Sequence, residues 1–368
     1  MTAHEDTNAV VDALRAWLGA LTLGEPLAHD GLAVYPARAG DGRTSPLRYA
    51  LLCQALASGQ AVVSEKRTPT VPTLEIENHG DTPVLILSGE EVVGGLQNRI
   101  VSTTALLPPR TAWDIGVLCV EAGRWHPRPP TTPEDAEVLQ PPAEDRFGRP
   151  TGRRADEPVG GTAFRYGGKE AQSLRRARHD WVTDHAGRLT SPVDQPAQWA
   201  ALAAIEARAG VQSPTGAMRD VYHARADRLA AFLAALPYAD GALGMVVGIG
   251  GQVVGADLFD QAHSAAVLWA TLVESYALDA LDEPASGPLQ PDEARRFVAR
   301  AAAGEAQVAP SLGLGTDVRL VEELVTGQSL VHDAVPAYTA LYRRTRLAGP
   351  GRFRVQRCSG RRRRQLGG

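Results

Sequence analysis

The first stretch of the chain has apolar residues at helical spacing. In residues 7–21 they recur three or four positions apart: Val10, Val11, Leu14, Trp17, Leu18 and Leu21. Side chains with this spacing line one face of a helix. The pattern therefore predicts an amphipathic helix that packs on the rest of the protein.

Between residues 31 and 125 the apolar runs become short and are separated by Gly, Pro, Asp and Asn. Runs such as "LAVYPA", "TLEIEN", "VLILSG" and "WDIGVLCVEAG" are typical of strands in a largely antiparallel sheet. Among them, "RYALLCQALASGQ" (48–60) predicts an inserted helix. Residues 126–168 contain eight prolines and almost no apolar periodicity, which indicates a loop or linker.

The rest of the chain is mainly helical in pattern, over 170–189, 196–210 and 220–237. The run "GMVVGIGGQVVG" (244–255) then places Gly250-Gly251 between two apolar segments, which predicts a tight β-hairpin. It leads into a long helix, "DLFDQAHSAAVLWATLVESYALDAL", with Asp257 or Asp260 as its expected N-cap. One more helix (291–303) and short strands over 317–345 complete the pattern.

These patterns predict an α+β protein with a mainly antiparallel N-terminal sheet and a helical C-terminal half that contains a β-hairpin. We expect an N-terminal helix and β-rich domain over 1–125 and a Pro-rich loop or linker over 126–168. A helical α+β part (169–345) would pack on the sheet, and a basic, disordered tail would follow at 346–368.

Charge and cysteine content narrow the class of protein. The net charge of -4 gives no overall attraction to nucleic acid or to an anionic membrane. Only Arg361–Arg364 could make weak, non-specific nucleic-acid contact. Three scattered cysteines fit a reducing compartment, and no run reaches the roughly 18 apolar residues of a membrane helix. We therefore expect a cytoplasmic protein without a membrane partner, and its Ala, Arg, Gly and Pro content is typical of a high-GC bacterial genome.

Common catalytic and cofactor motifs are absent from the sequence. It contains no GxxxxGK[ST], HExxH or GxSxG. Gly248-Ile249-Gly250 fails the dinucleotide fingerprint, because Val253 stands at the third glycine and a strand follows. The nine histidines show no ligand spacing, so no metal is predicted and no cofactor is assigned.

Two segments concentrate polar groups between apolar runs. The first, "GEEVVGGLQNRIVSTT" (89–104), surrounds Gly94-Gly95 with acids, amides and an arginine, and the glycines permit a bend or a bulge. The second, "CVEAGRW" (119–125), places Glu121 at the end of an otherwise apolar strand face. A carboxylate in that position needs a partner.

The two segments are joined by "LLPPRTAW", a length that suits an antiparallel pair with a Pro-containing turn. Pairing brings Gln97–Arg99 level with roughly Val120–Glu121. We therefore expect Arg99 within salt-bridge or one-water reach of Glu121, with Glu90 or Glu91 at the same sheet end. Apolar surroundings would raise the pKa of Glu121 toward neutrality, which suits a general base. An internal ion-pair network that only fixes the fold remains an open alternative.

Several runs resemble the ARPP domain family, which is named for its association with ADP-ribosylglycohydrolases and rhodanese-like phosphatases. They are "LILSGEEVVGGLQNRIVSTTALLPP", "VLCVEAGRW", "GADLFD" and "WATLVESYALDAL", and the similarity extends over residues 20–345. The family's GEE, QNR and CVExGRW elements map onto Gly89, Glu90, Glu91, Gln97, Asn98, Arg99, Cys119, Glu121, Gly123, Arg124 and Trp125.

The resemblance implies a setting of NAD and ADP-ribose metabolism. A nucleotide or ADP-ribose-like ligand would take arginines for its phosphates, an aromatic ring for its base and carboxylates for its ribose hydroxyls. The hypothesis makes Glu121, or else Glu90, the catalytic acid or base. The expected ligand-binding residues are Glu91, Gln97, Asn98, Arg99, Arg124 and Trp125. The alternative is a non-catalytic scaffold or sensor protein whose Glu/Arg network is structural.

Overall fold

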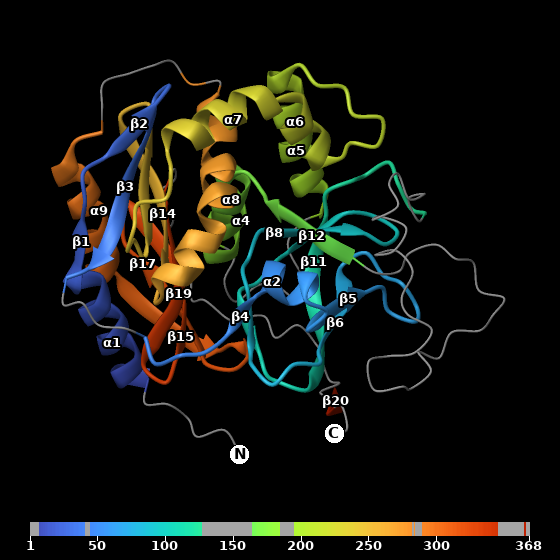
Figure 1. Cartoon of the computed structure of the whole chain (residues 1–368), viewed down its shortest axis with the longest axis horizontal. Helices are drawn as coiled ribbons and strands as arrows, with labels where there is room; N and C mark the ends of the chain where they lie inside the picture. Colours follow the sequence, from blue (N-terminus) through green and yellow to red (C-terminus); the bar gives the residue numbers. More distant parts are fainter. Residues whose placement is uncertain are drawn as a thin grey trace. The chain divides into compact units, whose positions relative to one another are not determined.

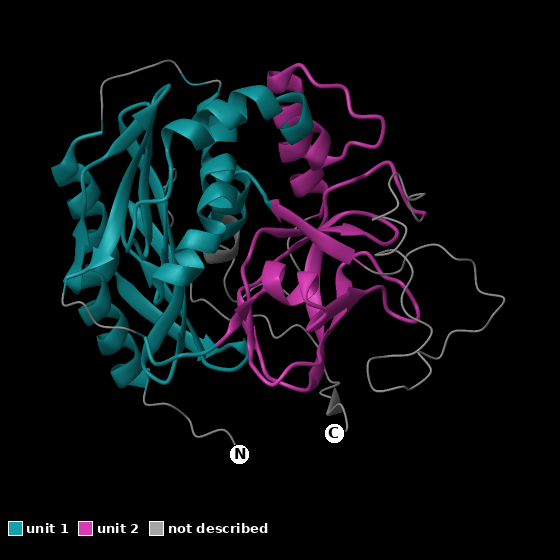
Figure 2. Cartoon of the chain, viewed as in Figure 1, with its two compact units in different colours: residues 1–48, 169–193, 222–357 teal, residues 49–168, 194–221, 358–368 magenta. Residues whose placement is uncertain are grey.

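The structure is a computed structural model that describes residues 7–40, 45–126, 164–184, 195–281, 283, 289–344 and 364–365. The chain forms two compact units (Figure 2). Unit 1 contains residues 1–48, 169–193 and 222–357, and unit 2 contains residues 49–168, 194–221 and 358–368. This division differs from the expected consecutive domains, because the first 48 residues cluster with the C-terminal part of the chain.

The expected linker and tail fall largely outside the described residues. Of the segment 126–168, residues 127–163 lie outside them, and β12 (Phe164–Lys169) begins within its last residues. Of the tail expected to be disordered, two residues are described. They form β20 (Arg364–Gln365), which pairs with Thr111 and Ala112, so backbone pairing orders the tail at these positions.

Unit 1 is built on an antiparallel sheet whose strands come from its first and its last sequence segment (Figure 1). Its strands follow the order β1-β3-β13-β14-β19-β18-β17-β15, and β2 pairs with β3. The bounds are β1 (Leu21–Leu23), β2 (Leu27–His29), β3 (Leu32–Ala39), β13 (Gly244–Ile249), β14 (Gln252–Phe259), β15 (Glu305–Pro310), β17 (Thr316–Val321), β18 (Val325–His332) and β19 (Val335–Arg343). β16 (Leu312–Gly313) also belongs to this unit. The N-terminal β3 pairs with β13 from Ala37↔Gly244 to Leu32↔Ile249, which explains why the first residues belong to unit 1.

Helices cover both faces of this sheet (Figure 1). On one face α1 (Thr7–Ala20) and α9 (Pro291–Ala303) share an apolar core with the strands. α1 buries Val10, Val11, Leu14 and Leu18, which confirms the predicted N-terminal helix. On the other face α8 (Ala262–Ala280) packs on β13 and β14, and α7 (Ala226–Ala235) and α4 (Gln172–Asp184) contact α8.

The predicted hairpin is confirmed, but its expected helix cap is wrong. β13 and β14 pair around Gly250 and Gly251, whose φ angles are 60° and 74°. The following helix has Gln261 at its N-cap. Asp257 instead lies within β14 and Asp260 accepts a hydrogen bond from the Ser45 hydroxyl, because the strand continues to Phe259 before the helix begins.

Unit 2 contains a second antiparallel sheet with the order β12-β8-β9-β11-β6-β5. Its strands are β5 (Ala61–Ser64), β6 (Thr73–Asn78), β8 (Glu90–Gly94), β9 (Arg99–Val101) and β11 (Thr111–Cys119). β7 (Val84–Ile86) pairs antiparallel with β10 (Ala105–Leu107) and parallel with β4 (Ala50–Leu51). Because β4 takes two residues of the predicted helix at 48–60, α2 is confined to Leu52–Ala57. α5 (Gln195–Ala209) packs on β11, and α6 (Met218–Ala224) leads the chain out of the unit.

The α+β class is confirmed, because helices and antiparallel sheets occur together and the N-terminal part is mostly strands. The C-terminal half carries more strand than the short segments predicted, since β13 to β19 supply most of the unit 1 sheet. Among the helices that the structure describes, none has the length and apolar composition needed to cross a membrane.

Candidate functional site

The polar cluster of unit 2 is organised by a bend between β8 and β9. Gly94 and Gly95 have φ angles of 141° and 47°, which confirms a bend at the glycine pair. A Cβ added to Gly95 would lie 2.3 Å from Cζ of Phe164 and 2.8 Å from Oε1 of Glu65. Glycine is therefore required here both for the backbone conformation and for close packing.

The predicted strand register is confirmed. Arg99 pairs with Cys119 and Val101 with Val117 in the β9–β11 ladder. Beyond its end, the Val120 amide donates to the Asn98 carbonyl at 3.1 Å, and Gln97 Nε2 donates to the Glu121 carbonyl at 3.2 Å. Residues 97–99 therefore lie level with residues 119–121, as the turn length predicted.

Arg124 is the centre of a closed hydrogen-bond network. Its Nη1 donates to the carbonyls of Gly95 and His126 at 2.8 and 2.7 Å. Its Nη2 donates to the Gly94 carbonyl and to Asn98 Oδ1, both at 3.1 Å, and lies 2.7 Å from Glu121 Oε2. Both terminal amino groups of Arg124 are thus engaged and hold the glycine bend in place, and only Nε lacks a hydrogen-bond partner among the described residues.

Glu121 is equally well satisfied. Its side chain is fully buried, and Oε2 also accepts from the Asn98 amide at 3.1 Å while Oε1 accepts from Thr215 Oγ1 at 3.0 Å. Burial alone would raise the pKa of Glu121, but hydrogen bonds from Arg124, Asn98 and Thr215 and the Arg124 charge lower it below the ordinary value. The expectation of a raised pKa was therefore wrong, because donors that stabilise the carboxylate outweigh its desolvation.

Gly123 explains how Thr215 reaches this network. The Gly123 amide donates to the Thr215 carbonyl at 2.7 Å, and a Cβ added to Gly123 would lie 2.9 Å from Thr215 Cα. Glu121 also forms a β-bridge with Ala217. The glycine of the CVEAGRW segment thus admits a backbone that is distant in the sequence.

Arg99 differs from Arg124, whose terminal amino groups are both engaged in hydrogen bonds. It is fully buried, its Nε donates to the Val71 carbonyl at 3.2 Å, and its Nη2 lies 3.9 Å from Glu65 Oε1. Nη1 and Nη2 have no hydrogen-bond partner among the described residues. Burial lowers the pKa of the guanidinium, although an arginine remains protonated at neutral pH. The ion pairs that form are Arg124–Glu121 and Arg99–Glu65, so the direct salt bridge expected between Arg99 and Glu121 is not formed, although the Glu121 charge still acts on the Arg99 guanidinium.

Trp125 and Glu65 complete the surroundings of Arg99. The Arg99 guanidinium lies 5.5 Å from the centre of the Trp125 ring, and Trp125 is 47% exposed. Glu65 directly follows β5 and was not among the predicted residues; an acid that ends the apolar run "AVVSE" was the only sequence signal. Burial raises the pKa of Glu65, against the lowering effects of the Leu96 amide, Arg99 and Arg124.

The two acids of the GEE segment point in different directions. Glu90 Oε2 accepts from the Leu87 amide at 2.7 Å, and Glu90 adds to the effect of burial that raises the pKa of Cys53 to about 12. Glu91 Oε2 lies 3.6 Å from Arg219 Nε. Alternation along β8 separates them, as predicted: Glu90 accepts from the Leu87 amide, whereas Glu91 pairs with Arg219.

The cluster retains several buried polar atoms without a hydrogen-bond partner among the described residues. They are Glu65 Oε2, Gln97 Oε1, Asn98 Nδ2, Arg99 Nη1, Arg99 Nη2 and Arg124 Nε. Buried polar groups are nearly always satisfied in native proteins, by protein, water or ligand. Four of these atoms are donors and two are acceptors, and three of the donors belong to the guanidinium groups of Arg99 and Arg124, so an oxyanion would complement them. Within the described ranges, no group of three or more His, Cys, Asp and Glu side chains could hold a metal ion.

Unit 1 contains a separate polar network that the sequence did not predict. Arg175 Nη1 lies 2.9 and 3.1 Å from the two carboxylate oxygens of Asp257, which also accept from the hydroxyls of Tyr276 and Tyr338. Arg175 Nη2 donates to Ser275 Oγ at 3.1 Å. Three of these residues come from the "GADLFD" and "WATLVESYALDAL" runs. The Asp257 carboxylate is fully engaged, so this network ties α4, β14, α8 and β19 together.

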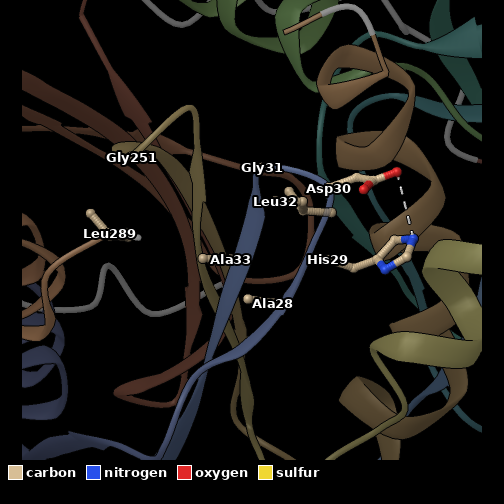
Figure 3. A pocket seen from close by; sticks show the side chains of 8 residues that line it. All are labelled: Ala28, His29, Asp30, Gly31, Leu32, Ala33, Gly251 and Leu289. Atoms are coloured by element: carbon tan, nitrogen blue, oxygen red, sulfur yellow. Dashed lines mark ion pairs between the residues drawn. The ribbon is translucent and has the colours of Figure 1, made fainter. Parts of the chain in front are cut away.

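A hollow of about 200 Å³ also lies in unit 1, beside two hairpin turns (Figure 3). His29, Asp30 and Gly31 line it from one turn and Gly251 from the other, and Leu289 closes one side. His29 Nε2 lies 3.8 Å from Asp30 Oδ2. Backbone and apolar atoms supply much of this lining, and it presents no unpartnered buried charge like that of Arg99.

The family comparison agrees with the pattern of motifs. The family model described as ARG and Rhodanese-Phosphatase-superfamily-associated Protein domain, ARPP-1, matches residues 20–342. The chain belongs to the ARPP-1 family. The match covers both compact units, and it includes the Arg99 cluster and the Asp257 network alike. Searches of curated proteins and of solved structures gave no match.

Proposed function

We propose that the protein binds a small anionic ligand of the nucleotide or ADP-ribose type, and that Arg99 is the residue that holds the anion. One observation carries this proposal: a fully buried guanidinium has both terminal amino groups without a hydrogen-bond partner among the described residues. Burying a cation without full pairing is costly, so an anion that accepts from both groups would be bound strongly.

The neighbouring residues suit such a ligand. The Trp125 ring is close to the Arg99 guanidinium and partly exposed, so it offers a surface for a base to stack on. Gln97 Oε1 and Asn98 Nδ2 add an acceptor and a donor that have no hydrogen-bond partner in the described part of the chain. In this proposal Arg124 and Glu121 act indirectly, since they hold the glycine bend and the strand end that carry these groups.

The second candidate is a scaffold whose Glu/Arg network is only structural, and the saturated Glu121–Arg124 pair favours it. The two candidates differ at Arg99. As a structural ion pair with Glu65, Arg99 would stabilise the fold, and its loss would cost about 3–5 kcal/mol. As a ligand group, Arg99 would also be needed for any effect of the ligand on stability, whatever its replacement costs the empty protein.

A thermal-shift experiment with Arg99→Met separates these candidates. ADP-ribose, NAD, nucleotides and phosphosugars are screened for stabilisation of the wild type, which reaches about 2.7 kcal/mol at a hundredfold excess over Kd. We expect the wild type to show a ligand shift and Arg99→Met to show none when its melting temperature is compared with that of its own empty form. Arg110→Met is the matched control, because Arg110 pairs with the exposed Asp81 and should leave the shift unchanged. A ligand shift that persists in Arg99→Met would exclude Arg99 as the anion site.

A further inference from the structure

Glu65 places a carboxyl group next to Arg99, which is unusual for a site proposed to bind an anion. Its Oε1 accepts from the Leu96 amide at 3.0 Å and lies 3.9 Å from Arg99 Nη2. Its Oε2 is buried and has no hydrogen-bond partner among the described residues. A Cβ added to Gly95 would lie 2.8 Å from Oε1, so the glycine leaves the space that the carboxyl group occupies.

An anion bound to Arg99 would lie close to the Glu65 carboxyl group. Because both negative charges would then share the Arg99 guanidinium in buried surroundings, they would repel each other strongly. The repulsion disappears if the carboxyl group is protonated, and Oε2–H then becomes a donor that points toward an oxygen of the ligand. The geometry therefore favours a neutral Glu65 in the bound state.

We propose that Glu65 is a second ligand-binding residue, which takes up one proton when an oxyanion binds to Arg99 and donates a hydrogen bond to that anion. This inference rests on the proposed function. It specifies the ligand class as an oxyanion with at least two accessible oxygens, one for the Arg99 amino groups and one for Glu65. A phosphodiester or pyrophosphate group meets this requirement.

The charges around Glu65 agree with proton uptake. The charged groups that face it are Arg99 from β9 and Arg124 from the segment after β11, and both favour the ionised form. Burial nevertheless dominates and raises the pKa of Glu65 above the ordinary value. An anion on Arg99 would neutralise the nearer cation and add a negative charge, so both effects would raise the pKa of Glu65 further.

Isothermal titration of the full chain with ADP-ribose tests the proposal, because the charge of its pyrophosphate is constant between about pH 5.5 and 8. Titrations in buffers of different ionisation enthalpy count the protons exchanged. We expect uptake of up to one proton, and an affinity that falls toward about tenfold per pH unit above the pKa of free Glu65. Glu65→Gln retains a hydrogen-bond donor, so it should bind with neither proton uptake nor this pH dependence. Glu75→Gln, on β6, should behave as wild type.

Each outcome decides a different question. Wild-type binding without proton uptake, or undiminished uptake by Glu65→Gln, would overturn the role of Glu65 and leave the Arg99 site intact. If wild type does not bind ADP-ribose, the proposed function fails together with this inference. If Glu65→Gln does not fold, the wild-type proton count decides alone.

Discussion

Removing Arg124 should destabilise the protein far more than removing a surface arginine with the same pairing geometry. Arg124 lies 2.7 Å from Glu121 at a spacing of three residues, and both side chains are buried. Arg295 lies 2.8 Å from Asp292 at the same spacing, but these side chains are 60% and 74% exposed. Burial is therefore the main difference between the two pairs.

The magnitude follows from what Arg124→Ala leaves behind. The Glu121 carboxylate would keep its bonds from Asn98 and Thr215 but lose its ion pair with Arg124, and the carbonyls of Gly94 and Gly95 would lose their Arg124 donors. Breaking a buried pair from one side costs about 3–5 kcal/mol. At about 2–4 °C per kcal/mol for a domain of roughly 150–250 residues, the melting temperature should fall by at least about 6 °C. Arg295→Ala should cost about 1 kcal/mol or less.

Thermal unfolding followed by circular dichroism measures both variants. The double variant Glu121→Gln/Arg124→Met is the informative third protein, because it removes both charges and should recover part of the loss. An Arg124→Ala effect no larger than that of Arg295→Ala would refute the reasoning. So would a double variant that is less stable than Arg124→Ala, because the stranded charge would then not be the cause.

The Glu121–Arg124 pair also predicts that the unfolding free energy falls at acidic pH. The folded-state pKa of Glu121 is lowered, so its contribution is complete above the unfolded pKa and is lost as pH falls toward the folded value. In Glu121→Gln the unfolding free energy should therefore fall less between about pH 5 and pH 3 than in wild type. Equal slopes for the two proteins would contradict a lowered pKa.

Two further predictions concern packing and a buried histidine. Gly123→Ala should cost about 1–3 kcal/mol in urea unfolding, because its Cβ would meet Thr215 Cα at 2.9 Å. The control is Gly19→Ala, which has nothing within 4 Å and should be neutral or stabilise α1. Equal effects of the two substitutions would show that the close approach is unimportant. The pKa of His179 is held well below its usual value by burial and nearby arginines, so stability should be lost as pH falls below about 6.5. His179→Gln should flatten this loss and the exposed His223→Gln should not, and a wild-type curve that is flat from about pH 6.5 to 5 would contradict the prediction.

Local patterns predicted the elements that form by local rules. The helical spacing from Val10 to Leu18 predicted α1, Gly250-Gly251 predicted the β13–β14 hairpin, and Gly94-Gly95 predicted the bend. The register of β9 on β11 also followed, because a short turn between consecutive strands fixes which residues face each other. Periodicity and turn chemistry act over a few residues, so the sequence contains the information needed for these features.

The partners of the buried charges were decided by the tertiary structure. Strand alternation suggested that Arg99 pairs with Glu121, but the chain turns after Cys119 and brings Arg124 back onto Glu121. Arg99 instead forms an ion pair with Glu65, which lies more than 30 residues earlier in the sequence. Ion pairing depends on distances of a few ångströms between side chains, which a one-dimensional pattern does not specify.

The pairing of strands that are far apart in the sequence could likewise not be predicted from the sequence pattern. β3 pairs with β13, about 200 residues away, and Thr215 enters the Glu121 network because Gly123 admits its backbone. The sequence therefore determined which residues are apolar, where the chain turns and which polar groups occur together. Only the folded chain determined which buried donors find a partner and which, on Arg99, have none among the described residues, because satisfaction of a buried group depends on every segment that surrounds it.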